Sequence, residues 1–214
     1  MKVGVIGSGD VGKALAAGFL KHGYETMIGT REPAKLAEWL KANPKAKVGG
    51  LSETAAFGEV VVLAVKGSVA AEALRAVGSK NLEGKLVMDA CNPIADAPPV
   101  NGVLKYFTTF DQSLMEQLQK EFSAAHLVKA FSSVGNHQFV NPQYKGGIRP
   151  TMFICGNDED AKATATKILD QFGWETADMG KVEAARAIEP LCMLWCILGF
   201  TRNEWTHAFK LLRQ

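Results

Sequence analysis

Residues 2–12 read KVGVIGSGDVG, an apolar run that ends in glycines with the spacing GxGxxG. The run is typical of a buried strand, and residues 10–22 predict a helix that stops at Gly23. A strand that leads through these glycines into a helix is the context in which the pattern binds a dinucleotide pyrophosphate. The helix N-terminus adds free N–H groups and a partial positive charge. The sequence therefore predicts a dinucleotide site, with a merely tight turn as the alternative, at Gly7, Ser8, Gly9, Asp10, Val11 and Gly12.

Each glycine of the pattern has its own expected task. Gly7 permits the tight turn, Gly9 lets the backbone approach a pyrophosphate without a Cβ in the way, and Gly12 allows close packing of helix on strand. Two later glycines, Gly67 and Gly135, follow predicted strands at the same edge. We expect a side chain at either of them to block a bound cofactor.

Outward from this motif, short β-branched runs alternate with longer amphipathic stretches. The predicted strands are residues 2–7, 25–29, 48, 60–65, 85–91, 126–131, 151–156 and 174–179, and the predicted helices are residues 10–22, 33–42, 53–57, 68–77, 113–122, 158–172 and 182–200. Repeated strand and helix units build a parallel sheet. We expect an α/β fold with a Rossmann-type doubly wound, mostly parallel sheet. It forms one NAD(P)-binding domain over residues 1–214, with residues 182–214 as a C-terminal helical extension.

Composition restricts the partner. The chain has 214 residues, which is room for one domain and an extension. Its 24 Lys and Arg nearly balance its 22 Asp and Glu, and the basic residues are scattered. This argues against nucleic acid and against a membrane surface as partners. A small molecule is expected instead.

Apolar runs and cysteines suggest a compartment. Residues 3–6 are too short for a signal peptide, and residues 191–200 (LCMLWCILGF) are about half the ~20 residues that span a bilayer. We expect a cytoplasmic protein in which residues 191–200 form a buried helix. The four cysteines are expected to be free thiols, and no metal site is expected, because Cys192 and Cys196 have only the isolated His207 near them in sequence.

The end of the second predicted strand indicates which dinucleotide is preferred. An NAD enzyme usually has an acidic residue there to hold the ribose 2′-hydroxyl. This chain instead reads Gly29-Thr30-Arg31-Glu32, with Lys35 one helical turn further on. Arg31 would bind a 2′-phosphate bidentately, Thr30 would donate its hydroxyl and Lys35 would add a charge. NADP(H) is therefore favoured, with an Arg31 paired to Glu32 on the surface as the alternative.

Catalytic acids and bases are mostly missing. The Tyr-x-x-x-Lys pattern of short-chain reductases is absent, since no tyrosine has a lysine four residues later. Asn136 and His137 follow the predicted strand 126–131 at its ligand-facing end. Two interpretations of His137 stay open, a contact with the substrate and an ordinary role in the loop. We predict no catalytic residue, because hydride transfer to a flavin-like acceptor needs mainly alignment of two cofactors.

A resemblance to a known family extends over nearly the whole chain. Its motifs are GSGDVG, GTRE, LAVKGSVAAEAL, DACNPI, KAFSSVGNHQFVNP, MFICGNDEDAKATATKIL and GKVEAARAIEPLCMLW. With them the sequence resembles the coenzyme F420-dependent NADP oxidoreductases, whose members pass hydride between NADP(H) and a deazaflavin. The nucleotide domain is also similar to the cytosolic part of the STEAP metalloreductases, whose membrane and haem part has no counterpart in this sequence.

The resemblance implies roles for individual residues. Ser8, Gly9, Asp10 and Val11 would form the pyrophosphate loop, and Thr30, Arg31 and Lys35 would hold the 2′-phosphate. Around the nicotinamide half we expect Ala64, Val65, Val69, Asn92 and Ile94, with Asn136 near the nicotinamide amide. Ser132 and His137 are the expected contacts of the acceptor substrate.

Two departures fall near the acceptor. Deazaflavin-reducing members are expected to have a His in the segment that reads Ala130-Phe131-Ser132-Ser133 here, and a Pro-Trp pair where this chain has Lys66-Gly67. The acceptor is therefore coenzyme F420 or a flavin, FMN or FAD. Two other functions stay open, namely a non-catalytic NADP(H)-binding redox sensor and a reductase of a small imine or carbonyl. We also expect a homodimer that pairs through the C-terminal helical region.

Overall fold

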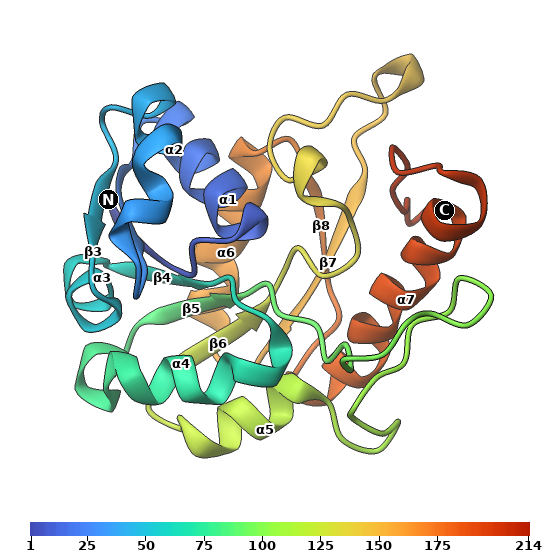
Figure 1. Ribbon diagram of the computed structural model, residues 1–214. Coiled ribbons are helices and arrows are strands. Elements are labelled where there is room, and N and C mark those ends of the chain that lie inside the picture. Colours follow the sequence, from blue (N-terminus) through green and yellow to red (C-terminus); the bar gives the residue numbers. More distant parts are fainter.

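One sheet of eight strands runs through the molecule in the computed structural model, which describes residues 1–214 (Figure 1). The strands lie in the order β3-β2-β1-β4-β5-β6-β7-β8. Their bounds are β1 Lys2–Ile6, β2 Glu25–Gly29, β3 Lys47–Gly49, β4 Val60–Leu63, β5 Leu86–Asp89, β6 His126–Lys129, β7 Thr151–Gly156 and β8 Glu175–Asp178. All neighbours are parallel except β6 and β7, which pair antiparallel. The predicted Rossmann-type, mostly parallel sheet is confirmed.

The helices cover both faces of this sheet. They are α1 Asp10–Lys21, α2 Ala37–Ala42, α3 Leu51–Phe57, α4 Ala70–Val77, α5 Leu114–Glu121, α6 Glu159–Gln171 and α7 Ala185–Arg202, with short 3-10 turns η1 Pro33–Leu36, η2 Gly67–Val69, η3 Ser79–Asn81, η4 Asn136–Gln138, η5 Lys145–Gly147 and η6 Val182–Ala184. One buried cluster joins the sheet to α1 and α6, and the other joins it to α3, α4, α5 and the start of α7 (Figure 1). Two cores on opposite faces are what a doubly wound sheet requires.

The winding of the sheet reverses next to β1. From β1 the chain proceeds outward to β2 and β3, then returns to β4 on the other side of β1. The crevice outside the carboxyl ends of β1 and β4 is therefore the topological switch point, where doubly wound folds bind ligands.

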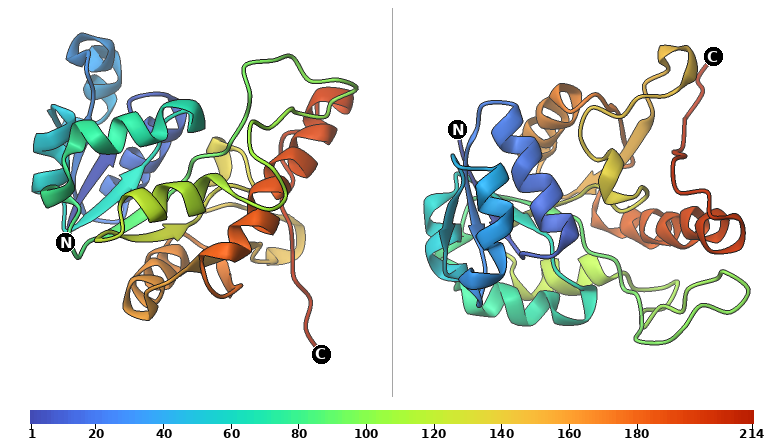
Figure 2. Two further views of the ribbon diagram at one scale, coloured as in Figure 1. Left: turned by 90° about the horizontal axis from the view of Figure 1, so that it is seen from below. Right: turned by 45° about the horizontal axis from the view of Figure 1, so that its top comes forward.

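The C-terminal region is helical only up to Arg202. Asn203 has a left-handed φ of 54° and ends α7. Residues 203–214 then fold back without helix, so that the Phe209 carbonyl accepts a hydrogen bond from the Thr151 N–H at the start of β7 (Figure 2). The predicted helical extension over residues 182–214 is thus correct for its first part and wrong for its last residues.

Helix α7 is less buried than the sequence predicts. Together with η6 it forms the stretch Val182–Arg202, which has the length and composition of a membrane-spanning helix, with a mean hydropathy of 1.3, and only 33% of its most apolar window is buried. It is longer than the apolar run because polar residues such as Glu189 continue the helix toward its start. The prediction of a buried helix was wrong, because α7 packs on the sheet with one side and leaves Leu194 and Phe200 exposed.

The predicted homodimer stays a prediction that this exposed side makes testable. Leu194 is 54% and Phe200 47% exposed. Gly102 packs against the C-terminal end of α7, beside which its loop runs (Figure 2). We expect a dimer by light scattering and a monomer after Leu194→Glu, since burying an unpaired carboxylate in an apolar interface is costly. Leu212→Glu, on the exposed tail, serves as the control. A monomeric wild-type protein would contradict the prediction.

Candidate functional site

The glycine-rich turn after β1 has the geometry that its sequence requires. Gly7 has a φ of 119°, and a Cβ there would lie 2.2 Å from the Ala64 carbonyl oxygen. A Cβ on Gly12 would lie 1.9 Å from the Gly7 carbonyl oxygen, so helix α1 touches the turn directly. Gly9 is the helix N-cap, and a Cβ there would meet nothing within 4 Å. Protein backbone therefore packs tightly against Gly7 and Gly12, whereas the space beside Gly9 is free.

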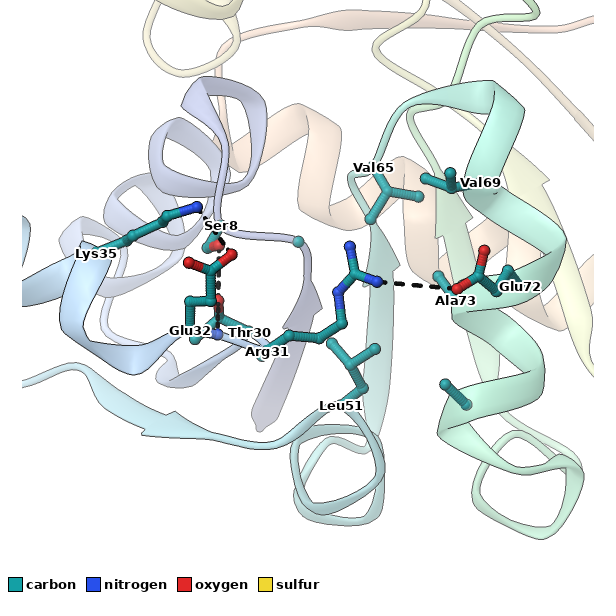
Figure 3. A pocket seen from close by; sticks show the side chains of 13 residues that line it. Ser8, Thr30, Arg31, Glu32, Lys35, Leu51, Val65, Val69, Glu72 and Ala73 are labelled. Carbon is teal, nitrogen blue, oxygen red and sulfur yellow. Dashed lines mark hydrogen bonds and ion pairs between the residues drawn. The ribbon is translucent and has the colours of Figure 1, made fainter.

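A pocket of about 190 Å³ lies on the β2 side of this turn. Figure 3 shows the side chains that line it, and Arg31 points across it toward α4. The residues expected from the sequence that line it are Gly7, Ser8, Thr30, Arg31, Lys35, Val65 and Val69. Val69 was expected beside the nicotinamide but lines only this pocket, on the β2 side of the turn. Those that sequence reasoning missed are Leu51, Glu72, Ala73 and Ala76, because α3 and α4 reach this pocket only through the fold.

Hydroxyl groups connect the turn to the end of β2. Ser8 Oγ donates to Thr30 Oγ1 at 2.9 Å, and the Glu32 N–H donates to the same oxygen at 3.1 Å. Thr30 is 6% exposed. Since its oxygen accepts twice, its own O–H remains free to donate into the pocket.

Both basic residues of the pocket have acidic neighbours. Lys35 Nζ lies 2.8 Å from Glu32 Oε1, and Arg31 Nη1 lies 3.8 Å from Glu72 Oε1 (Figure 3). The alternative of an Arg31 paired to Glu32 is therefore not what the structure contains. All four side chains are more than half exposed, so these ion pairs are weak. A bound anion with stronger, bidentate hydrogen bonds would displace the carboxylates.

A larger pocket of about 580 Å³ lies on the β4 side of the turn. It shares Val65 with the first pocket, so the two adjoin. It contains the expected residues Gly9, Asp10, Val11, Ala64, Val65, Asn92 and Ile94, and also Lys66, Gly67, Ser68, Ala90, Ala95 and Asp96. Its walls come from the starts of α1 and η2 and from the loop after β5, which all meet at the carboxyl edge of the sheet.

Two polar atoms without partners lie at the ends of β5 and β6. Asn92 Nδ2 donates to the Ser132 carbonyl at 3.3 Å, while Asn92 Oδ1 and Ser132 Oγ are buried and unpaired. Unpaired buried polar atoms are costly and are found mainly where a ligand or water completes them. Ser132 follows Phe131, a buried aromatic residue with a left-handed φ of 62°. Such backbone strain is typical of functional sites.

Asn136 and His137 lie elsewhere. They belong to η4, and with Ala14, Ala17, Gly18, Lys21 and Val140 they line a separate hollow of about 270 Å³. The segment after Phe131 carries η4 toward α1, where a Cβ on Gly18 would meet Val140. We expected Asn136 beside the nicotinamide and His137 beside the acceptor. In the structure they line this separate hollow and neither of the two pockets beside the glycine turn.

The tasks expected for Gly67 and Gly135 also need correction. A Cβ on Gly67 would lie 2.1 Å from the Asn92 carbonyl oxygen, and one on Gly135 would lie 2.7 Å from the Trp195 ring. Both glycines make room for protein groups rather than for a cofactor. Gly67 thereby lets η2 approach the loop after β5 and narrows the pocket between them.

One buried thiol borders this site. Cys91 lies directly before Asn92 and is fully buried. Burial, and next the charge of Asp89, raise the pKa of the Cys91 thiol well above its ordinary value. The thiolate, which is the nucleophile and redox-active form, is therefore disfavoured.

The residues present fit a phosphorylated dinucleotide. The open backbone at Gly9 lies at the N-terminus of α1, Arg31 and Lys35 line the smaller pocket, and Asn92, whose buried amide oxygen has no partner, lines the larger one. When bound there, such a cofactor would supply a hydride. The protein contributes binding and orientation.

Comparisons with known proteins agree with this geometry. Residues 2–93 match the family described as NADP oxidoreductase, coenzyme F420-dependent. The chain is 32% identical to a candidate F420-dependent NADP reductase from Arthrobacter sp. FB24, whose crystal structure it matches with a TM-score of 0.93 over 100% of both chains.

Two curated relatives are more distant. The F420-dependent NADP reductase of Methanocaldococcus jannaschii is 27% identical over 206 residues, which are 91% of this chain and 90% of that protein. The metalloreductase STEAP3 of Rattus norvegicus is 27% identical over 190 residues, which are 89% of this chain and 36% of that protein. The chain thus spans little more than a third of the metalloreductase.

Proposed function

Because the chain belongs to the family of coenzyme F420-dependent NADP oxidoreductases, we propose that it transfers hydride between NADPH and a flavin-like acceptor. Coenzyme F420 is the preferred acceptor in this proposal, and FMN and FAD are the alternatives. The observation that carries the proposal is the pair of adjoining pockets on either side of the Gly7 to Gly12 turn. Their common residue Val65 lies at the carboxyl edge of the sheet.

The smaller pocket takes the adenosine half in this proposal. Thr30 donates its free hydroxyl, and Arg31 and Lys35 give charged hydrogen bonds to the 2′-phosphate. The phosphate replaces Glu32 and Glu72 as their partner. The pyrophosphate lies against the open backbone at Gly9 and the N-terminus of α1.

The larger pocket takes the nicotinamide half and leaves one ring face for the acceptor. Asn92 Oδ1, buried and unpaired, accepts a hydrogen bond from the carboxamide. Val65 and Ile94 supply apolar contact. Ser132, the residue expected at the acceptor, is 2% exposed and lines neither pocket. Asn92, Val65 and Ile94 orient two ring systems and exclude water between them, which is the main protein contribution to a direct hydride transfer.

One of the two competing functions has less support. A reductase of a small imine or carbonyl needs a proton donor beside the substrate, and the residues considered for it, Asn136 and His137, line the hollow against α1. A flavin-like acceptor requires no such donor. A non-catalytic NADP(H)-binding redox sensor would bind the same cofactor without turnover, so it is separated from an enzyme by measuring turnover.

The experiment is steady-state oxidation of NADPH, followed at the nicotinamide absorbance, with coenzyme F420, FMN, FAD, a ferric chelate or a small cyclic imine as acceptor. We expect turnover with F420 and slower turnover with the flavins. Asn92→Ala should lower the rate about tenfold or more, because it removes one hydrogen bond that orients the reacting ring. Tight NADPH binding without turnover on any acceptor would favour the sensor, and turnover only with cyclic imines would favour the other reductase.

A further inference from the structure

A fully buried ion cluster contacts Cys91, the residue directly before Asn92, and the roles given so far do not include it. Lys129 Nζ lies 2.6 Å from Asp89 Oδ2 and 2.9 Å from Glu189 Oε1. The side chains of Lys129 and Asp89 have no exposure, and that of Glu189 has 2%. We refer to these three residues as the buried triad.

The fold brings the triad together from three distant segments. Asp89 and Lys129 are the last residues of β5 and β6 and face each other in the strand register. Glu189 comes from the first half of α7. Buried charges at the ends of otherwise apolar strands are costly unless they are paired, so these positions are not a packing accident.

The charge of the triad is balanced by a helix. Glu189 Oε2 and Oε1 accept hydrogen bonds of 3.0 Å each from the N–H groups of Leu114 and Met115, at the N-terminus of α5. The partial positive charge there compensates the second carboxylate. Burial by itself would lower the pKa of Lys129, but Asp89 and Glu189 outweigh it and raise that pKa above the ordinary value, so the ammonium stays charged.

The triad holds the backbone of one residue from both sides. Lys129 Nζ donates to the Cys91 carbonyl at 2.9 Å, and the Cys91 N–H donates to Asp89 Oδ1 at 2.9 Å. Asn92 follows directly, and residues 92 and 94–96 line the larger pocket. The position of this wall therefore depends on an ion cluster that α7 completes.

We propose that the buried triad positions the nicotinamide half of the cofactor, with Lys129 as the positioning residue that fixes the Cys91 carbonyl and hence Asn92. This inference rests on the proposed function, because it takes the larger pocket as the nicotinamide site. Lys129 acts through Cys91 and touches neither cofactor nor acceptor. The adenosine half, bound on the other side of the Gly7 to Gly12 turn, does not depend on it.

The test compares two ligands on one variant. Glu189→Gln keeps the shape of the side chain but replaces one acceptor oxygen with an N–H donor, which must then face either Lys129 or the Leu114 N–H. Dissociation constants are measured by calorimetry for NADPH and for 2′,5′-ADP, which has the 2′-phosphate but no nicotinamide. We expect binding of NADPH to weaken about tenfold and that of 2′,5′-ADP less than about twofold. Lys129→Met should give a larger difference of the same sign.

A core variant separates positioning from general destabilisation. Leu169→Ala removes a buried side chain of α6 in the other core cluster. It should lower the melting temperature and leave the ratio of the two dissociation constants unchanged. The inference would be overturned if Glu189→Gln weakened the binding of both ligands equally, or of neither. This test stands even if Lys129→Met does not fold. If the wild-type protein bound NADPH no more tightly than 2′,5′-ADP, the proposed function would be overturned, and the inference with it.

Discussion

Gly12→Ala is expected to lower the free energy of unfolding by about 3 kcal/mol, because the new methyl group has no space. Its Cβ would lie 1.9 Å from the Gly7 carbonyl oxygen, a backbone atom that cannot rotate away. The start of α1 would have to move from β1, and the helix N-terminus would no longer face the pockets. Chemical denaturation measures the loss, and fluorescence titration should detect no NADPH binding.

Gly9→Ala is the matched control for this variant. A Cβ at Gly9 would meet no protein atom within 4 Å, so the melting temperature should stay close to that of the wild type. The methyl group would instead stand where the pyrophosphate approaches, and we expect NADPH affinity to fall at least about tenfold. The assignment of the turn would be wrong if Gly12→Ala had the melting temperature of the wild type, or if Gly9→Ala bound NADPH with wild-type affinity.

Arg31→Ala is expected to weaken NADPH binding by about tenfold to a hundredfold and to leave NADH binding unchanged. A hydrogen bond to a charged group contributes about 1.5–3 kcal/mol, which corresponds to that range. NADH has no 2′-phosphate and would not respond to the loss. Titration of both nucleotides at two salt concentrations measures the effect, and the NADPH difference should shrink at high salt.

Glu72→Gln is the control on the other side of the pocket. It removes the carboxylate that lies 3.8 Å from Arg31 and would repel a 2′-phosphate. NADPH should bind roughly twofold to fivefold more tightly, since exposed charge pairs contribute about 0.2–1 kcal/mol. If Arg31→Ala weakened NADH as much as NADPH, Arg31 would bind some part of the cofactor other than the 2′-phosphate.

Sequence reasoning predicted most of the fold because apolar periodicity determines it. The strands and helices lie close to the predicted ranges, and the family expected from the motifs is confirmed. The antiparallel pairing of β7 with β6 was not predicted, because an apolar run such as TMFICG does not show in which direction the strand runs in the sheet. Nor does a wide apolar stripe reveal that α7 covers the core with one side only.

The site was predictable where backbone and short motifs determine it. The glycine turn and the GTRE segment led to the two pockets, but Leu51 and Glu72 reach the first pocket only through tertiary packing. Lys129 and Asp89 do carry a signal in the sequence, because each is a charged residue within an apolar run, HLVKAF or KLVMDAC. A buried charge in a strand implies a partner, although sequence alone does not say that Glu189 completes it.

The late position of Glu189 in the sequence bears on the order of synthesis. A nascent chain that has emerged up to residue 180 already contains the glycine turn, both strand ends and α5. Its Lys129 then has one carboxylate partner instead of two, and the N–H groups of Leu114 and Met115 have none. The second carboxylate of the buried triad, and the partner of these two N–H groups, are therefore supplied only after residue 189 has been synthesised.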